Sequence, residues 1–351
     1  MGEILGLGVT HYPGLAMQGN LAARVKTFRN DPQLPAHYRD PAAWPEPMRE
    51  EWADDEGQAH SDQHRAALIQ NFRWARAELD AFNPDLVLVW GDDQYENFRE
   101  DGVPAFQVLA YDTFDVKPWE HHQRPNSWNE APDTNFVFKG HRSAGKYLAT
   151  RLLEDSFDVA YSYKPNHAAM PHAFLNTALY LDWDRTGFPY PMLPFAINCY
   201  GRALIASRGT PVSKISDIPI GEDLDPPSPQ PSRCFDVGRA IARAMQASPW
   251  RVALIASSSW SHSFLSSRCS YFHPDVEADK RYFRALQEAD YDMWRETPLA
   301  NVEASGHQEL LNWFCLMGAM SELGRKPSEA RFLESWLCNS DKVFAVYHPE
   351  S

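Results

Sequence analysis

The sequence has few cysteines, and nothing in their spacing suggests a disulfide framework or a zinc knuckle. It contains five of them, an odd number, with no Cys-x-x-Cys pair. Sequences that bind structural zinc or depend on disulfides carry paired and regularly spaced cysteines. We therefore expect most of the five to be small buried hydrophobic residues. They are Cys199, Cys234, Cys269, Cys315 and Cys338.

Positive charge and long apolar runs are also scarce. Lys and Arg number 33 against 47 Asp and Glu, which gives a formal net charge of −14 at pH 7. A duplex-binding protein needs a basic surface, so we expect no nucleic-acid partner. No apolar run is long enough to span a bilayer, and the first residues lack the charged-then-apolar pattern of a secretory leader. The expectation is a cytoplasmic protein without a membrane partner.

Short apolar runs of strand length alternate with stretches of helical periodicity, such as residues 59–82. This alternation predicts an α/β fold, with a mostly central β-sheet flanked by helices and an active site at the strand carboxyl ends. No shift in composition marks a linker, so we expect residues 1–351 to form a single catalytic domain. Residues 18–55 are rich in Pro, Trp and charge without a clear period, and we expect a long irregular loop insertion there.

Four of the predicted strands end in polar residues. The first runs into His11, the second into the Asp92–Gln94 group, and two later ones into Asn166-His167 and Ser261-His262. One such histidine is as often a hydrogen-bonded core residue as a working one, but four polar endings suggest one shared cleft. Histidine with carboxylate suits metal-assisted or acid–base chemistry. His172, which follows Pro171, is instead expected to cap or pack a helix.

Glu309 adds a carboxylate to this set. It begins a predicted helix that is apolar on most sides, so its side chain should be buried. A buried carboxylate without a partner is costly. From the residues alone the partner is either an arginine or a helix N-terminus, or else a metal ion.

The order and spacing of these motifs resemble the catalytic subunit of the class III extradiol ring-cleavage dioxygenases. This is the protocatechuate 4,5-dioxygenase β-subunit superfamily, with methylgallate dioxygenases among its members. The resemblance covers most of the chain. The matched segments are Thr-His-Tyr-Pro-Gly-Leu at 10–15, Pro-Asp-Leu-Val-Leu-Val-Trp-Gly-Asp-Asp at 84–93, Asn-His at 166–167, Leu-Pro-Phe-Ala-Ile-Asn at 193–198, Arg-Cys-Phe-Asp-Val-Gly at 233–238, Ser-His at 261–262, and Glu309 with Trp313.

The resemblance implies a non-haem Fe(II) held by two histidines and one carboxylate, with open positions for a catechol and O2. Carried over by position, His11 is the first ligand and Glu309 is the carboxylate. His262 corresponds to the acid–base residue beside the substrate hydroxyl. His167 corresponds to a second active-site histidine that helps to orient substrate or oxygen.

One position departs from the family pattern. The second histidine ligand of the family follows an aspartate at the end of the second strand, and this chain has Gln94 after Asp93. Members resembling methylgallate dioxygenases share the Gly-Asp-Asp-Gln run, so Gln94 fits a subgroup. Three alternatives remain open: Gln94 binds the metal, another histidine such as His60 or His64 replaces it, or the metal is lost.

The expected function is that of a non-haem Fe(II)-dependent extradiol dioxygenase, which cleaves a catechol-type aromatic ring with O2. A metal-poor non-catalytic subunit or binding protein on the same fold is one alternative. A zinc-dependent hydrolase is another, because histidine and glutamate also suit zinc. The expected partners are a small aromatic substrate and O2. Relatives are commonly dimers or larger, so a homo-oligomer is expected, and a small partner subunit stays open.

Overall fold

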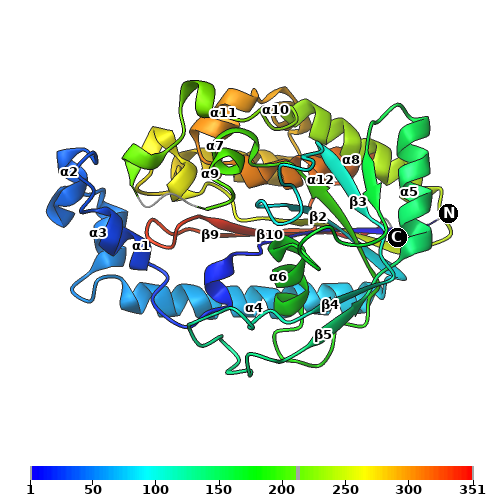
Figure 1. Ribbon diagram of the computed structural model, residues 1–351, viewed down its shortest axis with the longest axis horizontal. Helices are drawn as coiled ribbons and strands as arrows, with labels where there is room; N and C mark the ends of the chain where they lie inside the picture. The colour runs from blue at the N-terminus through cyan, green and yellow to red at the C-terminus, as the bar shows by residue number, and fades with distance from the viewer. Residues whose placement is uncertain (1, 211–213, 350–351) are drawn as a thin grey trace.

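The structure, a computed structural model, describes residues 2–210 and 214–349. Its centre is a mixed sheet of eight strands in the order β6-β3-β7-β2-β8-β1-β10-β9 (Figure 1). The strands of this sheet are β1 (Ile4–Val9), β2 (Leu86–Asp92), β3 (Phe106–Leu109), β6 (Ala160–Ser162), β7 (Met192–Ile197), β8 (Val252–Ser257), β9 (Glu329–Leu333) and β10 (Lys342–Tyr347). A separate ribbon pairs β4 (Thr113–Val116) with β5 (Phe136–Lys139).

The four central strands, β7, β2, β8 and β1, run parallel to one another. Every residue in these strands is buried. A parallel sheet is covered on both faces, which explains why these strands are continuous apolar runs and not alternating ones. Their carboxyl ends lie at one edge of the sheet, where α/β proteins bind their ligands.

Helices cover both faces of the sheet, and the predicted α/β fold class is confirmed. One apolar core lies between the sheet and the helices α5 (Arg142–Glu154), α8 (Pro231–Gln246), α9 (Val276–Glu288), α10 (Tyr291–Glu296), α11 (Leu299–Ala304) and α12 (Leu311–Glu322). The other core lies between the sheet and the helices α4 (Gln58–Phe82) and α6 (His172–Leu181). Figure 1 shows these two groups of helices on opposite sides of the strands.

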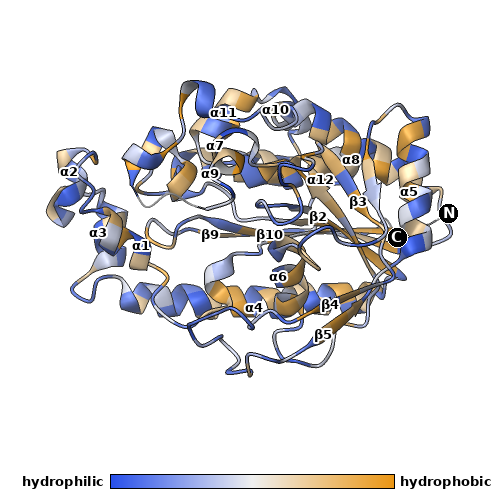
Figure 2. Ribbon diagram, in the orientation of Figure 1, coloured by the Kyte–Doolittle hydropathy of each residue, from blue (hydrophilic) through white to orange (hydrophobic). Residues whose placement is uncertain are grey.

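The long helix α4 matches the periodic stretch that the sequence predicted. Its buried residues recur every three or four positions, from Leu68 through Phe72 and Ala75 to Leu79. This spacing places one apolar stripe against the sheet. Figure 2 shows the resulting alternation of hydrophobic and hydrophilic residues along the helix. Within the described ranges, none of the helices combines the length and the apolar character needed to cross a bilayer.

Helices α8 and α12 pack unusually closely because each contributes a glycine to the contact. A Cβ atom on Gly238 would lie 1.9 Å from the carbonyl oxygen of Cys315. A Cβ atom on Gly318 would lie 1.9 Å from the carbonyl oxygen of Phe235. Any larger side chain would push the helices apart, since interiors are close-packed. The contact therefore fixes α12, whose first turn follows Glu309.

The expected irregular loop at 18–55 instead contains short helices, so that part of the prediction is wrong. The helices are α1 (Ala23–Phe28), α2 (Ala36–Arg39) and α3 (Glu46–Trp52). They project at the end of the molecule beyond β9 (Figure 1) and share a small core that includes Trp44, Met48, Phe272 and Leu337. Proline precedes α2 and α3 as the N-cap residue. Both helices are too short to show a sustained period in the sequence.

Candidate metal centre

The candidate centre lies where several elements meet at the carboxyl edge of the sheet. Asp92 is the last residue of β2, and His11 follows the end of β1 by two positions. His172 is the first residue of α6, which runs back along the sheet from its preceding proline. Glu309 lies in the single 3-10 turn Gln308–Leu310 that leads into α12. The fold thus brings together residues that are far apart in the sequence.

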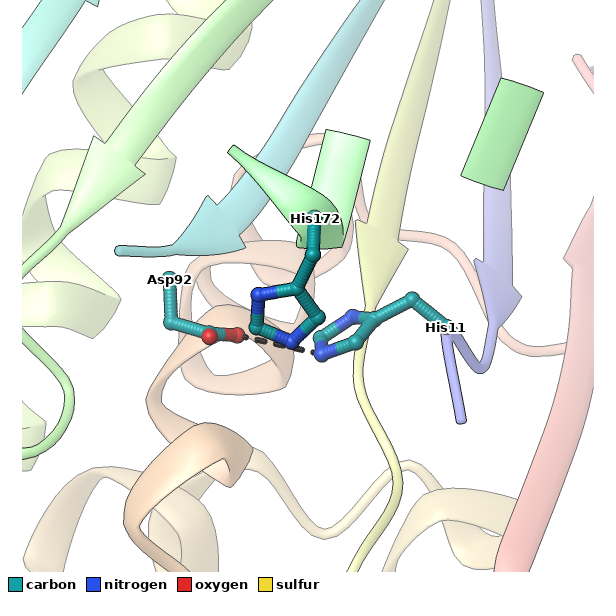
Figure 3. Close-up of side chains that lie close together, drawn as sticks. All are labelled: His11, Asp92 and His172. Carbon is teal, nitrogen blue, oxygen red and sulfur yellow. Dashed lines mark ion pairs between the residues drawn. The ribbon is translucent and has the colours of Figure 1, made fainter. Parts of the chain in front are cut away.

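His11, Asp92 and His172 form a cluster with the spacing of metal ligands. One ligand atom from each residue lies within 4.8 Å of the others. Figure 3 shows the two imidazole rings and the carboxylate pointing toward one another, with Nε2 of His11 3.4 Å from Oδ1 of Asp92. His11 and Asp92 are fully buried, and His172 is partly buried.

Hydrogen bonds behind the two imidazoles fix which nitrogen faces the cluster. Nδ1 of His11 lies 3.0 Å from the carbonyl oxygen of Ser257 and donates to it. Nδ1 of His172 lies 3.0 Å from Oε2 of Glu96, again as the donor. Each ring therefore keeps Nε2 for the cluster. Metal-binding histidines are held in this way, by a carbonyl or carboxylate on the second nitrogen.

Glu309 extends the cluster on the side of His11. Its Oε2 lies 3.2 Å from Nε2 of His11, and its Oε1 lies 3.1 Å from Nε2 of His262. The hydroxyl of Tyr200 also donates to Oε1. Asn312 donates to the oxygen of Asp92 that faces His11, with its amide nitrogen 3.3 Å from Oδ1.

Three buried atoms on these residues lack a hydrogen-bond partner among the described residues, although two of them, on His11 and Glu309, form an ion pair. They are Nε2 of His11, Oδ2 of Asp92 and Oε2 of Glu309, and all are buried. Buried polar atoms are almost always hydrogen-bonded, so several such atoms at one point need an explanation. One cation would satisfy all three. The donor set, imidazole nitrogen with carboxylate oxygen, fits a transition-metal ion such as Fe(II) or zinc.

The buried carboxylates of the centre favour the charged form of both imidazoles. Burial acts to lower the pKa of His172, but the carboxylates of Glu96, Asp92 and Glu309 outweigh it and raise that pKa to about 10. Burial likewise opposes the charged form of His11, while Asp92 and Glu309 raise its pKa overall. A metal ion binds the unprotonated imidazole, so it would replace these protons as the positive charge.

Gln94 lies outside this cluster. Its side-chain nitrogen donates to the carbonyl oxygen of Gly209 at 2.6 Å. The chain turns sharply after β2 because Asp93 accepts backbone hydrogen bonds from Glu96, Asn97 and Phe98. Gln94 lines the same cavity as His172, but its amide nitrogen bonds to Gly209 and not to a residue of the cluster. That Gln94 binds a metal stays a prediction.

Of the other histidines that the sequence singled out, one lies at the site and the others bond elsewhere. His262 is buried beside Glu309, as expected for a residue of the site. His167 is exposed, and its Nε2 lies 3.0 Å from Oδ2 of Asp101. His60 is 3.2 Å from Glu51 and outside the cluster. His64 stacks on His60, so it offers no ligand to the cluster either.

Sequence reasoning missed three residues of the site: Asp92, His172 and Tyr200. Asp92 belonged to the polar group after the second strand, but the family pattern directed attention to Gln94. His172 was expected to cap or pack a helix, which is the commoner role after a proline. Only its long-range contacts with His11 and Glu96 reveal the other role. Tyr200 carried no sequence signal.

One cavity, of about 420 Å³, reaches the cluster and is lined by His172, Glu96 and the loop residues Trp119, His122 and Arg124. A second cavity, of about 370 Å³, reaches Tyr200, which bonds to Glu309, and its lining also includes Phe264 and Gln308. The ring of Phe264 also contacts the ring of His262, with centroids 5.5 Å apart.

Residues 215–339 match a family model described as the catalytic LigB subunit of aromatic ring-opening dioxygenase. The resemblance to the extradiol ring-opening dioxygenases is confirmed. The part that matches the dioxygenase model contains His262 and Glu309, whereas His11, Asp92 and His172 come from the preceding part of the chain.

Curated dioxygenases are similar to this chain at low identity. A gallate dioxygenase of Pseudomonas putida is 22% identical over 202 residues, which are 56% of this chain and 50% of the relative. The match thus spans about half the length of that dioxygenase. A 2,3-dihydroxyphenylpropionate/2,3-dihydroxicinnamic acid 1,2-dioxygenase of Photorhabdus laumondii is 22% identical over 259 residues, 70% of this chain and 68% of the relative.

A crystal structure of an uncharacterized protein from Escherichia coli K12 also matches, with a TM-score of 0.45 and 14% sequence identity. The match covers 80% of this chain and 92% of that one.

Proposed function

We propose that residues 1–351 form a single catalytic domain that opens the ring of a catechol-type substrate with O2, using Fe(II). The observation that carries the proposal is the buried cluster of ligand atoms on His11, Asp92 and His172, which lie within 4.8 Å of one another, with the carboxylate of Glu309 3.2 Å from His11. Similarity to dioxygenases named for gallate and for 2,3-dihydroxyphenylpropionate supports the reaction type.

In this proposal His11 and His172 supply imidazole ligands, and Glu309 and Asp92 supply carboxylate ligands. His172 thus takes the place that the family pattern reserves for a histidine at Gln94, and it comes from α6 instead of β2. Fe(II) bound there would supply the redox chemistry between the substrate and O2, which protein side chains lack. The protein supplies the binding, orientation and proton transfer.

His262 is the proposed acid–base residue. Its Nε2 lies 3.1 Å from Oε1 of Glu309, so the carboxylate holds a proton on that nitrogen. Its Nδ1 is buried and has no hydrogen-bond partner within the part of the chain that the structure describes. Nδ1 is therefore the atom that accepts a proton from a substrate hydroxyl and later returns it. Histidine suits this role near neutral pH.

The proposed substrate is a catechol that carries a carboxylate. The cavity beside His172 contains Arg124, to which the described residues offer no ion-pair partner, and His122 next to it. Trp119 supplies an aromatic wall. A cavity of about 420 Å³ has room for one substituted ring, and the guanidinium suits a carboxylate at its far end.

Metal analysis and oxygen uptake test the proposal. Protein purified without oxygen or chelators, then reconstituted with Fe(II), should hold one iron per chain and consume O2 with carboxylated catechols. The product should be ring-opened by mass spectrometry. Tight zinc binding without oxygen uptake would replace the proposal with a zinc hydrolase. Failure to bind either metal would leave a binding protein or non-catalytic subunit.

A further inference from the structure

Tyr200 lies between the candidate metal centre and the cavity of about 370 Å³. It is the N-cap residue of helix α7 (Gly201–Ala206), three positions after the end of β7. Its side chain is only 4% exposed, yet it forms part of the cavity wall. Its hydroxyl donates a hydrogen bond to Oε1 of Glu309. Neither the sequence motifs nor the dioxygenase comparisons assign a role to this residue.

The two oxygens of Glu309 have different surroundings. Oε1 accepts from Tyr200 and lies 3.1 Å from Nε2 of His262, so two donors hold it. Oε2 lies 3.2 Å from Nε2 of His11 and has no hydrogen-bond partner among the described residues. One oxygen is therefore committed to the protein, and the other faces the candidate ligands.

We propose that Tyr200 is a positioning residue, which holds Glu309 so that Oε2 alone binds the metal and Oε1 stays with His262. The inference rests on the proposed function, because it requires a metal at this centre. Hydrogen bonds to a metal-binding carboxylate fix its orientation and tune its charge.

Without the Tyr200 hydroxyl, His262 alone would restrain Oε1. The carboxylate could then rotate and bind the metal through both oxygens. His262 would lose the acceptor that holds the proton on its Nε2. One hydroxyl would thereby affect both the metal geometry and the orientation of the proposed acid–base residue.

Cobalt(II) binding tests the inference without relying on turnover. The variant is Tyr200→Phe, which removes one oxygen atom and keeps the ring. The matched control is Tyr347→Phe, because Tyr347 is also buried and, among the residues that the structure describes, its hydroxyl bonds only to the sulfur of Met317. We expect Tyr200→Phe to weaken Co(II) affinity by about 10- to 100-fold. We also expect its visible absorption spectrum to change as the coordination number rises.

A second measurement needs no variant and so does not depend on the folding of Tyr200→Phe. Wild-type protein with 13C-labelled glutamate carboxylates is examined by infrared difference spectroscopy as Co(II) is added. The inference predicts the wide separation of stretching bands that a carboxylate bound through one oxygen gives. The narrow separation of a two-oxygen carboxylate would overturn it.

The outcomes separate this inference from the proposed function. If wild type and Tyr347→Phe bind Co(II) and Tyr200→Phe matches them in affinity and spectrum, the positioning role is wrong and the metal centre stands. If wild type binds neither Co(II) nor Fe(II), both the positioning role and the proposed function are wrong.

Discussion

Replacing His172 should remove the metal, whereas replacing Gln94 should not. The structure places an imidazole nitrogen of His172 within 4.8 Å of ligand atoms on His11 and Asp92. The side-chain amide of Gln94 instead donates a hydrogen bond to the carbonyl oxygen of Gly209. The change that tests this is His172→Asn, which removes the distant ring nitrogen and keeps a small polar side chain at the start of α6.

The expected magnitude follows from the place of His172 in the centre. Removing only an outer partner of a ligand costs about 10- to 100-fold in metal affinity. Removing the ligand itself should cost more, at least about 100-fold, or about 2.8 kcal/mol. Because His172 also holds Glu96, the double variant His172→Asn/Glu96→Gln should lose metal equally while avoiding an unpaired buried carboxylate.

The assay is anaerobic titration with Fe(II) or Co(II) after each variant has been shown to fold by circular dichroism. His167→Asn is the matched control, since it makes the same substitution at an exposed histidine paired with Asp101. His167→Asn and Gln94→Ala should bind metal as wild type does. Wild-type affinity in His172→Asn together with metal loss in Gln94→Ala would refute the reasoning and restore Gln94 as the ligand.

Three further predictions concern the cavity, the core and acid stability. Arg124→Gln should raise KM for a carboxylated catechol by about tenfold or more, because it removes a charge-assisted hydrogen bond, and should leave KM for unsubstituted catechol unchanged in steady-state oxygen uptake. Gly318→Ala should lower the free energy of unfolding by about 1–3 kcal/mol in urea titrations, since its Cβ would meet the carbonyl oxygen of Phe235, whereas Gly102→Ala, where space is open, should not. Burial, aided by Lys342 and His60, holds the pKa of His64 well below its ordinary value. The neutral His64 therefore contributes to stability when the pH is above that ordinary pKa, and this contribution is lost as the pH falls below it. His64→Leu should therefore reduce the loss of stability below pH 6.5. In wild type this histidine contributes at most about 1.4 kcal/mol per pH unit to that loss. An unchanged slope of stability against pH would contradict the lowered pKa of His64.

The fold was predictable where the sequence pattern is governed by local burial. The runs that became β1, β2, β7 and β8 are apolar up to their last residues because both faces of a parallel sheet are covered. The long helix α4 was predictable because apolar residues recur with helical spacing along its 25 residues. The helices within 18–55 were not predictable in this way, because helices of four to seven residues are too short to display a period.

The candidate site was predictable only in part, for a reason visible in its geometry. His11 and His262 follow predicted strands and Glu309 begins a predicted helix, and the structure brings the three together. Asp92 and Gln94 are only two residues apart at the end of β2. The turn between them depends on the backbone hydrogen bonds that Asp93 accepts, and no rule of residue spacing predicts these bonds.

The alternative of a metal-poor, non-catalytic subunit depended on Gln94 standing where the family has a histidine. That argument assumes that the missing ligand can come only from the end of the second strand. The structure offers an imidazole from α6 instead, with Glu96 behind its second nitrogen as metal-binding histidines require. A decayed site would have no reason to keep the carboxylates of Asp92 and Glu309 buried around His11, since two buried carboxylates side by side cost stability without a cation. The Gly-Asp-Asp-Gln run is therefore better explained as a relocation of one ligand than as its loss.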